Sequence, residues 1–379
     1  MKKIFLLFSL ALVALAGCKK DPAPGQDQKP EQEQGEKPEP KPEPEPEPEP
    51  EQTVVFTLPA NCYIVSKEGT YSFKTLRGNS DESVGEVVSV EVLWESFGTD
   101  VEPAVGDLIK SVSYKDGEIV FEATDKKGNA VIAAKDPKNI ILWSWHIWLT
   151  DTPQEVVYNN EAGTMMDRNL GATSVTPGDI CAFGLFYQWG RKDPFLGSSS
   201  VTDPVYAAST IDWPATVASD PFHGTIEFAV ANPTTYITCN GGNYDWYYTR
   251  DGSVDNARWV ESGRTKSVYD PCPAGWRIPD GGENSVWAKA GWDNTPYDKT
   301  NMGMSFATSS PSTTWYPSAG CLVYALGDIN SVGSGGFYAS ASPSTEHYAY
   351  NFFFSEHGAV TAKSSNVRAN AMSVRCIKE

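Results

Sequence analysis

The chain has 379 residues and a formal net charge of −18 at pH 7. Four lysines are the only charged side chains in the first 20 residues, and residues 21–52 carry a net charge of −8, so residues 53–379 carry −14. A surface this acidic repels nucleic acid and anionic lipid headgroups, so we expect no nucleic-acid partner. The 12 Trp, 17 Tyr and 32 Gly favour strands and loops over long helices.

The first 17 residues have the layout of an export signal. Met1-Lys2-Lys3 is followed by an apolar run from Ile4 to Ala14 and then by Leu15-Ala16-Gly17-Cys18. A positive start, an apolar stretch and a small residue before the cleavage site are what the export machinery reads. The alternatives are a plain cleaved signal and a membrane anchor, but the run is shorter than the roughly 18–20 residues that span a bilayer. We predict a lipoprotein signal peptide over residues 1–17.

Cys18 is then the lipidated first residue of the mature chain. It resembles lipoprotein cysteines that carry a diacylglyceryl thioether and an N-acyl chain, and several acyl chains together anchor stably where one does not. We therefore expect a palmitate-type anchor in the outer membrane. Lys19-Lys20-Asp21 resembles a short signal that routes lipoproteins of the Bacteroidetes to the cell exterior. This predicts an exterior-facing location, with the periplasmic face as the alternative.

Residues 18–52 are predicted to be the lipidated cysteine and a disordered linker. From Asp21 to Gln52 apolar side chains are nearly absent, and Pro and Glu alternate from Pro38 to Glu51. Such a segment cannot bury enough surface to offset its conformational entropy. At about 3.1 Å per residue, roughly 30 residues reach on the order of 90 Å. We expect a spacer between membrane and folded domains, and the alternative is a proline-rich ligand for an aromatic groove.

Residues 53–150 show short strands and turn signals. Leu108–Tyr114 and Glu118–Ala123 flank Asp116-Gly117, a two-residue turn of the type that closes hairpins. In Ile140–Leu149 every second residue is apolar, which predicts a central strand, and the partly polar opposite face suits a strand near a domain boundary. We predict a small all-β sandwich that is immunoglobulin-like.

The spacing of histidines and cysteines bears on metals and disulfides. Besides Cys18 there are six cysteines, which permit many pairings in an oxidising compartment, and no Cys-x-x-Cys pair occurs. The four histidines are widely spaced, so no zinc site is expected. His146 lies among tryptophans. A ligand site is one interpretation, and a buried histidine with one hydrogen-bond partner is the one that we favour.

Four motifs follow in order after residue 150. They are Met166–Ala172, Gly184–Asp193, Cys272–Pro279 and Ser373–Cys376. The series resembles the Fibrobacter succinogenes major paralogous domain family over more than half of the chain. That family resembles C-type lectin-like and formylglycine-generating-enzyme domains, which implies a loop-rich α+β domain over residues 151–379 with its two ends close together. Asn61–Val65, Gly128–Ala133 and Leu142–Trp148 resemble an N-terminal module of Bacteroidetes surface proteins, which implies architecture only.

One short helix is expected after Pro279. Asp280-Gly281-Gly282-Glu283 has capping-box spacing ahead of Val286-Trp287-Ala288, and Gly291 can end the helix. A closing strand is expected over Met372–Ile377.

If that strand lies beside the loop before the helix, Cys272 and Cys376 can form a disulfide. The bond would stabilise the fold by a few kcal/mol in the chain-entropy model. The alternative is two buried free thiols.

A candidate ligand or calcium loop lies within Gly197–Lys266, between two of the family motifs. Its oxygen-bearing side chains suit calcium, and its aromatic side chains offer flat faces for sugar rings or protein anchors. The spacing fails the EF-hand pattern, and the alternative is a polar surface loop whose Asn, Asp and Gly residues make turns. The candidates are Asn240, Asn243, Asp245, Trp246, Tyr247, Asp251 and Asp255.

Catalytic motifs give no positive indication of an enzyme. A nucleophile elbow, a P-loop, a dinucleotide fingerprint and a His-Glu-x-x-His pair do not occur in the sequence. Formylglycine-generating relatives need a dedicated cysteine pair, and Cys321 and Cys376 match no such motif. The calcium-binding triplets of sugar-binding C-type lectins are also missing. We therefore predict no catalytic residues and no cofactor, with calcium at the candidate loop as the one exception considered.

These observations together predict a surface lipoprotein that acts as a non-catalytic recognition or adhesion module. The expected partners are the membrane, through the lipid anchor, and a glycan or protein ligand on a surface, and the chain could belong to a fimbrial tip. An enzyme on the formylglycine-generating scaffold is the first alternative. A purely structural envelope protein is the second.

Overall fold

In the computed structural model, the described residues are 52–213, 215–239, 244–248, 254–261, 265–292 and 295–379. All of them belong to one compact unit, which begins at Pro50. The predicted signal peptide, Cys18 and the linker up to Glu51 lie outside the described residues. No helix in this described part is long and apolar enough to cross a membrane.

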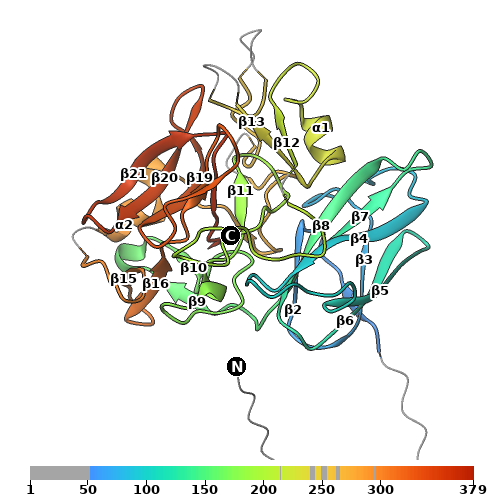
Figure 1. The fold of residues 1–379 in the computed structure, drawn as a ribbon, viewed down its shortest axis with the longest axis horizontal. Helices are drawn as coiled ribbons and strands as arrows, with labels where there is room; N and C mark the ends of the chain where they lie inside the picture. Colours follow the sequence, from blue (N-terminus) through green and yellow to red (C-terminus); the bar gives the residue numbers. More distant parts are fainter. Residues whose placement is uncertain (1–51, 214, 240–243, 249–253, 262–264, 293–294) are drawn as a thin grey trace, which may run out of the picture. The chain divides into compact units, whose positions relative to one another are not determined.

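Two four-stranded sheets form the N-terminal region, coloured blue to green in Figure 1. One has the order β1-β3-β6-β5 and the other the order β2-β8-β7-β4. Phe73 of β3 and Trp145 of β8 lie with ring centroids 5.2 Å apart, so the two sheets share a core in a sandwich-like arrangement. The strands are β1 Val54–Phe56, β2 Cys62–Val65, β3 Gly69–Lys74, β4 Ser89–Ser96, β5 Ile109–Lys115, β6 Glu118–Ala123, β7 Gly128–Lys135 and β8 Ile141–Leu149.

The sandwich departs from the expected immunoglobulin pattern in its strand pairing. β1 runs parallel to β3, and β2 runs parallel to β8, whereas immunoglobulin sheets are antiparallel. The predicted hairpin is confirmed, because Lys115 pairs with Glu118 across the two-residue turn. Asp116 and Gly117 have φ values of 53° and 86° there. These left-handed conformations are what a type I′ turn requires.

Strand β8 is central, as its alternation predicted, with β2 on one side and β7 on the other. Trp145 and Ile147 point into the core of the sandwich. The opposite face, with His146 and Trp148, is also buried. There the indole Nε1 of Trp148 donates a hydrogen bond of 3.1 Å to the carbonyl of Ala172. This face therefore packs against the C-terminal region.

A 7-stranded sheet dominates the C-terminal region, with the order β18-β17-β22-β19-β20-β21 and with β11 paired to β22 (Figure 1). A four-stranded sheet has the order β14-β23-β10-β9, and β12-β13 and β15-β16 form two-stranded sheets. The strands are β9 Glu155–Val157, β10 Thr164–Met166, β11 Phe186–Gln188, β12 Ala215–Ala218, β13 Thr235–Thr238, β14 Trp276–Arg277, β15 Gly303–Ala307, β16 Thr313–Pro317, β17 Cys321–Leu322, β18 Ile329–Asn330, β19 Gly335–Pro343, β20 Tyr348–Ser355, β21 Val360–Val367, β22 Ala371–Ser373 and β23 Ile377–Lys378.

The predicted α+β class, with a C-type lectin-like domain, is wrong. Across the described residues, α-helix is limited to α1 Ile226–Ala231 and α2 Val286–Ala290, of six and five residues. The protein is mostly β in both regions. The physical reason is local: α1 ends just before Pro233, which lacks a backbone N–H and disfavours helical geometry at Asn232, and Gly291 ends α2.

Helix α2 is the helix expected after Pro279, but its cap is another residue. The Ser285 hydroxyl accepts the N–H of Ala288, and Gly291 ends the helix at a φ of 74°. Asp280 is not the cap, because its carboxylate accepts a hydrogen bond of 3.1 Å from Nη2 of Arg277.

The expected closing strand is divided into β22 and β23. Ile377 of β23 lies opposite Met165 of β10. The beginning and the end of the C-terminal region are therefore neighbours in one sheet, as the family resemblance implied.

Buried polar side chains join the two regions. The Ser144 hydroxyl of β8 donates to Asp193 Oδ1 over 2.6 Å, and Lys192 Nζ donates to the Ser144 carbonyl over 3.0 Å. Asn61 donates through Nδ2 to the carbonyl of Val268 over 2.7 Å. Because these groups are enclosed, they stabilise the fold only while both regions stay docked.

Candidate functional site

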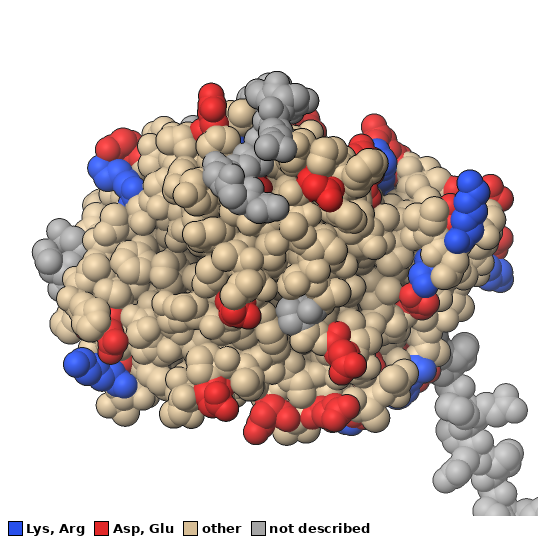
Figure 2. Space-filling model, turned by 45° about the horizontal axis from the view of Figure 1, so that its top comes forward, with Lys and Arg blue, Asp and Glu red and all other residues tan. Residues whose placement is uncertain are grey.

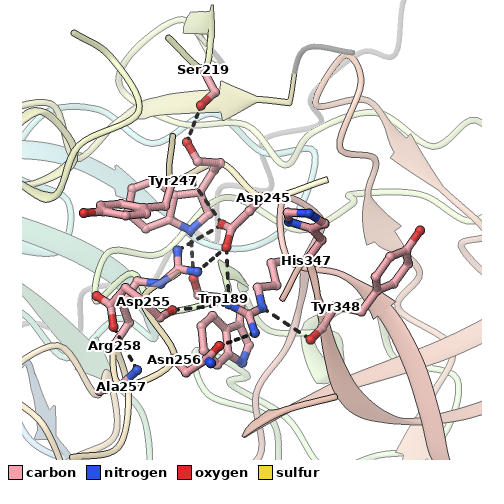
Figure 3. A network of polar contacts seen from close by, with 12 residues as sticks. Trp189, Ser219, Asp245, Tyr247, Asp255, Asn256, Ala257, Arg258, His347 and Tyr348 are labelled. Atoms are coloured by element: carbon pink, nitrogen blue, oxygen red, sulfur yellow. Dashed lines mark hydrogen bonds and ion pairs between the residues drawn. The ribbon is translucent and has the colours of Figure 1, made fainter. Parts of the chain in front are cut away.

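The predicted loop residue Asp245 lies in the interior, between two arginines (Figure 3). Its Oδ1 accepts a hydrogen bond of 3.0 Å from Arg258 Nη1, and its Oδ2 contacts Nη2 of the same arginine. Arg368 Nη1 lies 3.5 Å from Oδ2. The Asp245 side chain is 1% exposed and both arginine side chains are 0% exposed. We call these three residues the buried charge cluster. Both Asp245 oxygens are occupied by guanidinium groups, so this carboxylate does not offer a calcium ligand.

Aromatic rings enclose the buried charge cluster. The guanidinium groups of Arg258 and Arg368 lie 4.6 and 4.4 Å from the ring centroid of Trp189. Trp246 donates through Nε1 to the Trp189 carbonyl over 2.7 Å, and its own carbonyl accepts from Ser219 over 2.8 Å. Trp246 is fully buried. It is therefore a core residue rather than the exposed platform for a sugar ring that the sequence suggested.

Arg368 connects the cluster to strand β20. Its Nη2 donates to the Thr345 carbonyl and to Asn256 Oδ1, both over 2.6 Å, and its Nε donates to the Tyr348 carbonyl over 3.3 Å. Burial lowers the pKa of Arg368 to about 10, so the side chain stays charged at neutral pH. Figure 3 shows the Tyr348 ring turned away from the arginines.

Four half-exposed tyrosines form a group of which two adjoin the buried charge cluster: Tyr348 through its carbonyl and Tyr244 as the chain neighbour of Asp245. The Tyr244 ring centroid lies 5.8 Å from that of Tyr324 and 5.7 Å from that of Tyr348. Tyr350 lies two residues farther along β20 and so shares the face of Tyr348. All four side chains belong to partly exposed residues. We call Tyr324, Tyr244, Tyr348 and Tyr350 the tyrosine row.

The structure places the other predicted loop residues in different environments or does not describe them. The ring centroid of Tyr247, a half-buried residue, lies 5.4 Å from the Arg258 guanidinium group. Asp255 Oδ1 accepts the N–H of Ala257 over 2.8 Å, which makes a turn of the kind the alternative interpretation expected. Asn240, Asn243 and Asp251 lie outside the described residues. Among those described, no group of three or more His, Cys, Asp or Glu could hold a metal ion.

The predicted disulfide is confirmed. Cys272 and Cys376 are bonded, with their Cα atoms 6.0 Å apart and a separation of 104 positions along the chain. Of the free thiols, Cys321 is buried, and burial raises its pKa to about 12. Burial also raises the pKa of Cys62. Both thiols therefore stay protonated at neutral pH, and a protonated thiol is a poor nucleophile.

His146 is the buried histidine that we favoured. Its Nε2 lies 2.9 Å from Asn129 Oδ1, and its Nδ1 lies 3.4 Å from the hydroxyl of Tyr187. Asn129 donates through Nδ2 to the Gly171 carbonyl, which leaves Oδ1 as the acceptor for Nε2–H. Burial lowers the pKa of His146 to about 3. The ring is therefore neutral, and its contacts with Asn129 and Tyr187 lie where the sandwich packs against the C-terminal region.

Sequence reasoning missed Arg258, Arg368 and most of the tyrosine row. The pattern Tyr348-Ala349-Tyr350 did place two rings on one face of a strand, and this signal could have been used. Nothing local connects Arg368 with Asp245, because the contact joins distant parts of the chain. Comparison with models of protein families, with curated proteins and with solved structures finds no match to this chain.

Proposed function

We propose that this protein is a lipid-anchored outer-membrane protein whose folded region recognises a glycan or protein ligand without catalysing a reaction. In this proposal it serves adhesion, including at a fimbrial tip. The observation that carries the proposal is the tyrosine row. Tyrosine combines a flat apolar ring with a polar hydroxyl, so adjacent half-exposed tyrosines suit contact with sugar rings or with a protein surface.

The tyrosine row is connected to the buried charge cluster. Arg368 binds the Tyr348 carbonyl, and Tyr244 adjoins Asp245 in the chain. A recognition surface whose side chains are already ordered loses less conformational entropy when a ligand binds. The buried charge cluster therefore supports binding through preorganisation rather than through direct contact.

The charge of the surface indicates which ligands it would reject. Figure 2 shows acidic side chains spread over one face, with basic side chains at its edges. Across the chain, 48 Asp and Glu outnumber 30 Lys and Arg. Such a surface disfavours polyanionic ligands through repulsion, which falls with ionic strength.

The enzyme alternative has less support from the titratable groups. Burial raises the pKa of Asp270 to about 6, but this side chain is enclosed and accepts the N–H groups of Cys272 and Ile278 over 2.8 and 2.9 Å. His146 is likewise enclosed between the two regions. A general acid or base has to reach the substrate. These two shifts therefore favour structural roles over catalysis.

Placement in the membrane rests on Cys18 and the acidic linker. The expected result is that the wild-type chain incorporates radiolabelled palmitate and that Cys18→Ser does not. Proteinase treatment of whole cells then separates the two faces, because an exterior protein is digested and a periplasm-facing protein survives. A wild-type chain that takes up no label would contradict the anchor.

Binding is tested with the mature chain carrying Cys18→Ser, which keeps the linker and the whole folded region. We expect it to bind members of a glycan array or a panel of surface proteins, equally with and without chelator. Tyr348→Ala should abolish this binding. Tyr114→Ala, in strand β5 of the sandwich, is the matched control and should keep it. If the Cys18→Ser chain without further substitution binds neither the glycans nor the surface proteins, the recognition function is wrong and the purely structural alternative is favoured.

A further inference from the structure

A groove of about 500 Å³ opens beside Tyr350, at one end of the tyrosine row. One wall is formed by strands β19 and β20, through Ser342 and Tyr350. The other is formed by the short 3₁₀ turn Gly282–Asn284 and by the chain from Asn256 to Glu261. Its volume falls within the range of about 300–1,000 Å³ that small-ligand sites occupy.

We propose that this groove binds the sugar rings of an uncharged glycan. The inference rests on the proposed recognition function and narrows it from a glycan or protein ligand to a neutral saccharide. Three features of the groove carry it: a fixed aromatic ring, hydrogen-bonding groups of both kinds, and carboxylates that leave no site for an anion.

The Tyr350 ring is held in place by a pair of glycines. A Cβ atom on Gly281 would lie 2.4 Å from Tyr350 Cβ, and one on Gly282 would lie 3.2 Å from a ring carbon. Gly282 also has a φ of 69°, which side chains disfavour. The backbone therefore presses directly against the tyrosine. A ring fixed in this way offers a flat apolar face to the C–H face of a sugar at little entropic cost.

Polar groups in the groove supply both donors and acceptors. Arg368 occupies Oδ1 of Asn256, so the Nδ2 donor is the end of this amide that a ligand would meet. The Ser342 hydroxyl accepts the N–H of Gly281 over 2.9 Å and keeps its own hydrogen to donate. Asn284 is exposed at the rim. Sugar hydroxyls donate and accept at once, and so they match such a mixed set of partners.

The charge of the lining points to a neutral ligand. Glu261, Asp280 and Glu283 line the groove, and among its described lining residues none is Lys or Arg. Sialylated and sulfated sugars would be repelled. A basic peptide is less well matched, because Asp280 already accepts from Arg277 over 3.1 Å and Glu283 accepts from Lys363 over 2.5 Å. Two of the three carboxylates thus have a cation already.

The test uses the mature Cys18→Ser chain on an array of neutral, sialylated and sulfated glycans, with hexalysine as the basic probe. We expect neutral glycans alone to bind, with an affinity that hardly changes between low and high salt. Tyr350→Ala should weaken binding about tenfold or more, and Tyr350→Phe should keep it, because the ring remains. Asn284→Ala changes an exposed side chain and should weaken binding severalfold.

The outcomes separate this inference from the function on which it rests. If Tyr348→Ala abolishes binding while Tyr350→Ala and Asn284→Ala leave it unchanged, the recognition function stands and the groove is not the sugar site. Salt-sensitive binding of hexalysine that Glu261→Gln and Glu283→Gln remove would replace the sugar by a basic peptide. Each variant should keep the thermal midpoint of unfolding of the parent Cys18→Ser chain. An unchanged midpoint shows that the variant is folded, so that a loss of binding comes from the site itself.

Discussion

Asp245 and Arg258 form a two-point ion pair in the protein interior although they lie 13 residues apart in the chain. Arg368, the residue directly after strand β21, approaches the same carboxylate and also donates to the Tyr348 carbonyl of β20. One negative charge thus faces two positive charges in a site closed to solvent. Removing the carboxylate would leave both arginines buried without a counter-charge, which is costly.

Asp245→Asn is therefore expected to lower the free energy of unfolding by about 3–5 kcal/mol. Urea denaturation of the mature Cys18→Ser chain measures the loss. Asp255→Asn is the control, since its carboxylate accepts one N–H in a turn and an amide oxygen can do the same. If Asp245→Asn and Asp255→Asn have the same free energy of unfolding, the buried charge cluster does not stabilise the fold.

Calcium is expected to leave the stability of the protein unchanged. Both oxygens of Asp245 are occupied by arginines, so the carboxylate at the centre of the predicted loop has no free position for the ion. The thermal midpoint of unfolding should be the same in millimolar calcium and in excess chelator. A midpoint that rises with calcium concentration would establish a site that includes other residues of the loop.

Loss of the disulfide is expected to destabilise the fold. The bond closes a loop with a sequence separation of 104, and the chain-entropy model assigns about 3–5 kcal/mol to such a loop. The double variant Cys272→Ser, Cys376→Ser should unfold at lower urea, whereas Cys239→Ser should differ little. Alkylation of the unfolded, unreduced chain should leave Cys272 and Cys376 unmodified, and labelling of both would contradict the bond.

Stability should fall as the pH drops below about 6.5 because of His146. Its folded pKa is lowered to about 3 by burial, while the unfolded chain binds the proton near its ordinary value of about 6.5. The unfolded state thus takes up more protons in this window, which costs up to about 1.4 kcal/mol per pH unit. The contribution of neutral His146 is present above that window and lost as the pH falls.

The measurement is the difference in pH dependence between the wild type and His146→Gln. The comparison is needed because Asp270 acts in the opposite sense: its folded pKa is raised to about 6, so its protonation stabilises the fold as the pH falls toward 4. In the His146→Gln variant, the free energy of unfolding should no longer fall with pH because of His146. The rise in stability that comes from protonation of Asp270 should remain. Identical slopes in both proteins would show that His146 titrates normally in the folded state.

Lys192→Met is expected to destabilise the joint between the two regions by about 3–5 kcal/mol. The substitution removes the donor to Ser144 and leaves Asp193 buried without its cation. Lys135→Met, in a pair whose acidic partner Glu91 is half exposed, is the control and should cost about 1 kcal/mol or less.

Because the two regions are docked through buried polar groups, the wild type should unfold in one transition that tryptophan fluorescence and circular dichroism report at the same urea concentration. Separate transitions in the wild type would mean that the two regions unfold independently.

Elements that depend on neighbouring residues could be predicted from the sequence. The Asp116-Gly117 turn needs left-handed conformations that these two residue types adopt, and the alternation in Ile140–Leu149 marks a strand buried in the middle of a sheet. The short helix before Gly291 follows from the same kind of local signal. The α+β class failed because it came from a resemblance rather than from the strand-rich composition.

The amino-acid sequence alone thus determined the short-range elements, which are the hairpin, the central strand and the presence of a short helix before Gly291, together with the acidic net charge. Only the tertiary structure decided that Asp245 lies between two buried arginines instead of facing solvent, and that Tyr244, Tyr324 and Tyr348 meet in one row. The physical reason is distance along the chain. Hydrogen bonds within a turn are set by adjacent residues, whereas the burial of a charge depends on which remote strands pack around it.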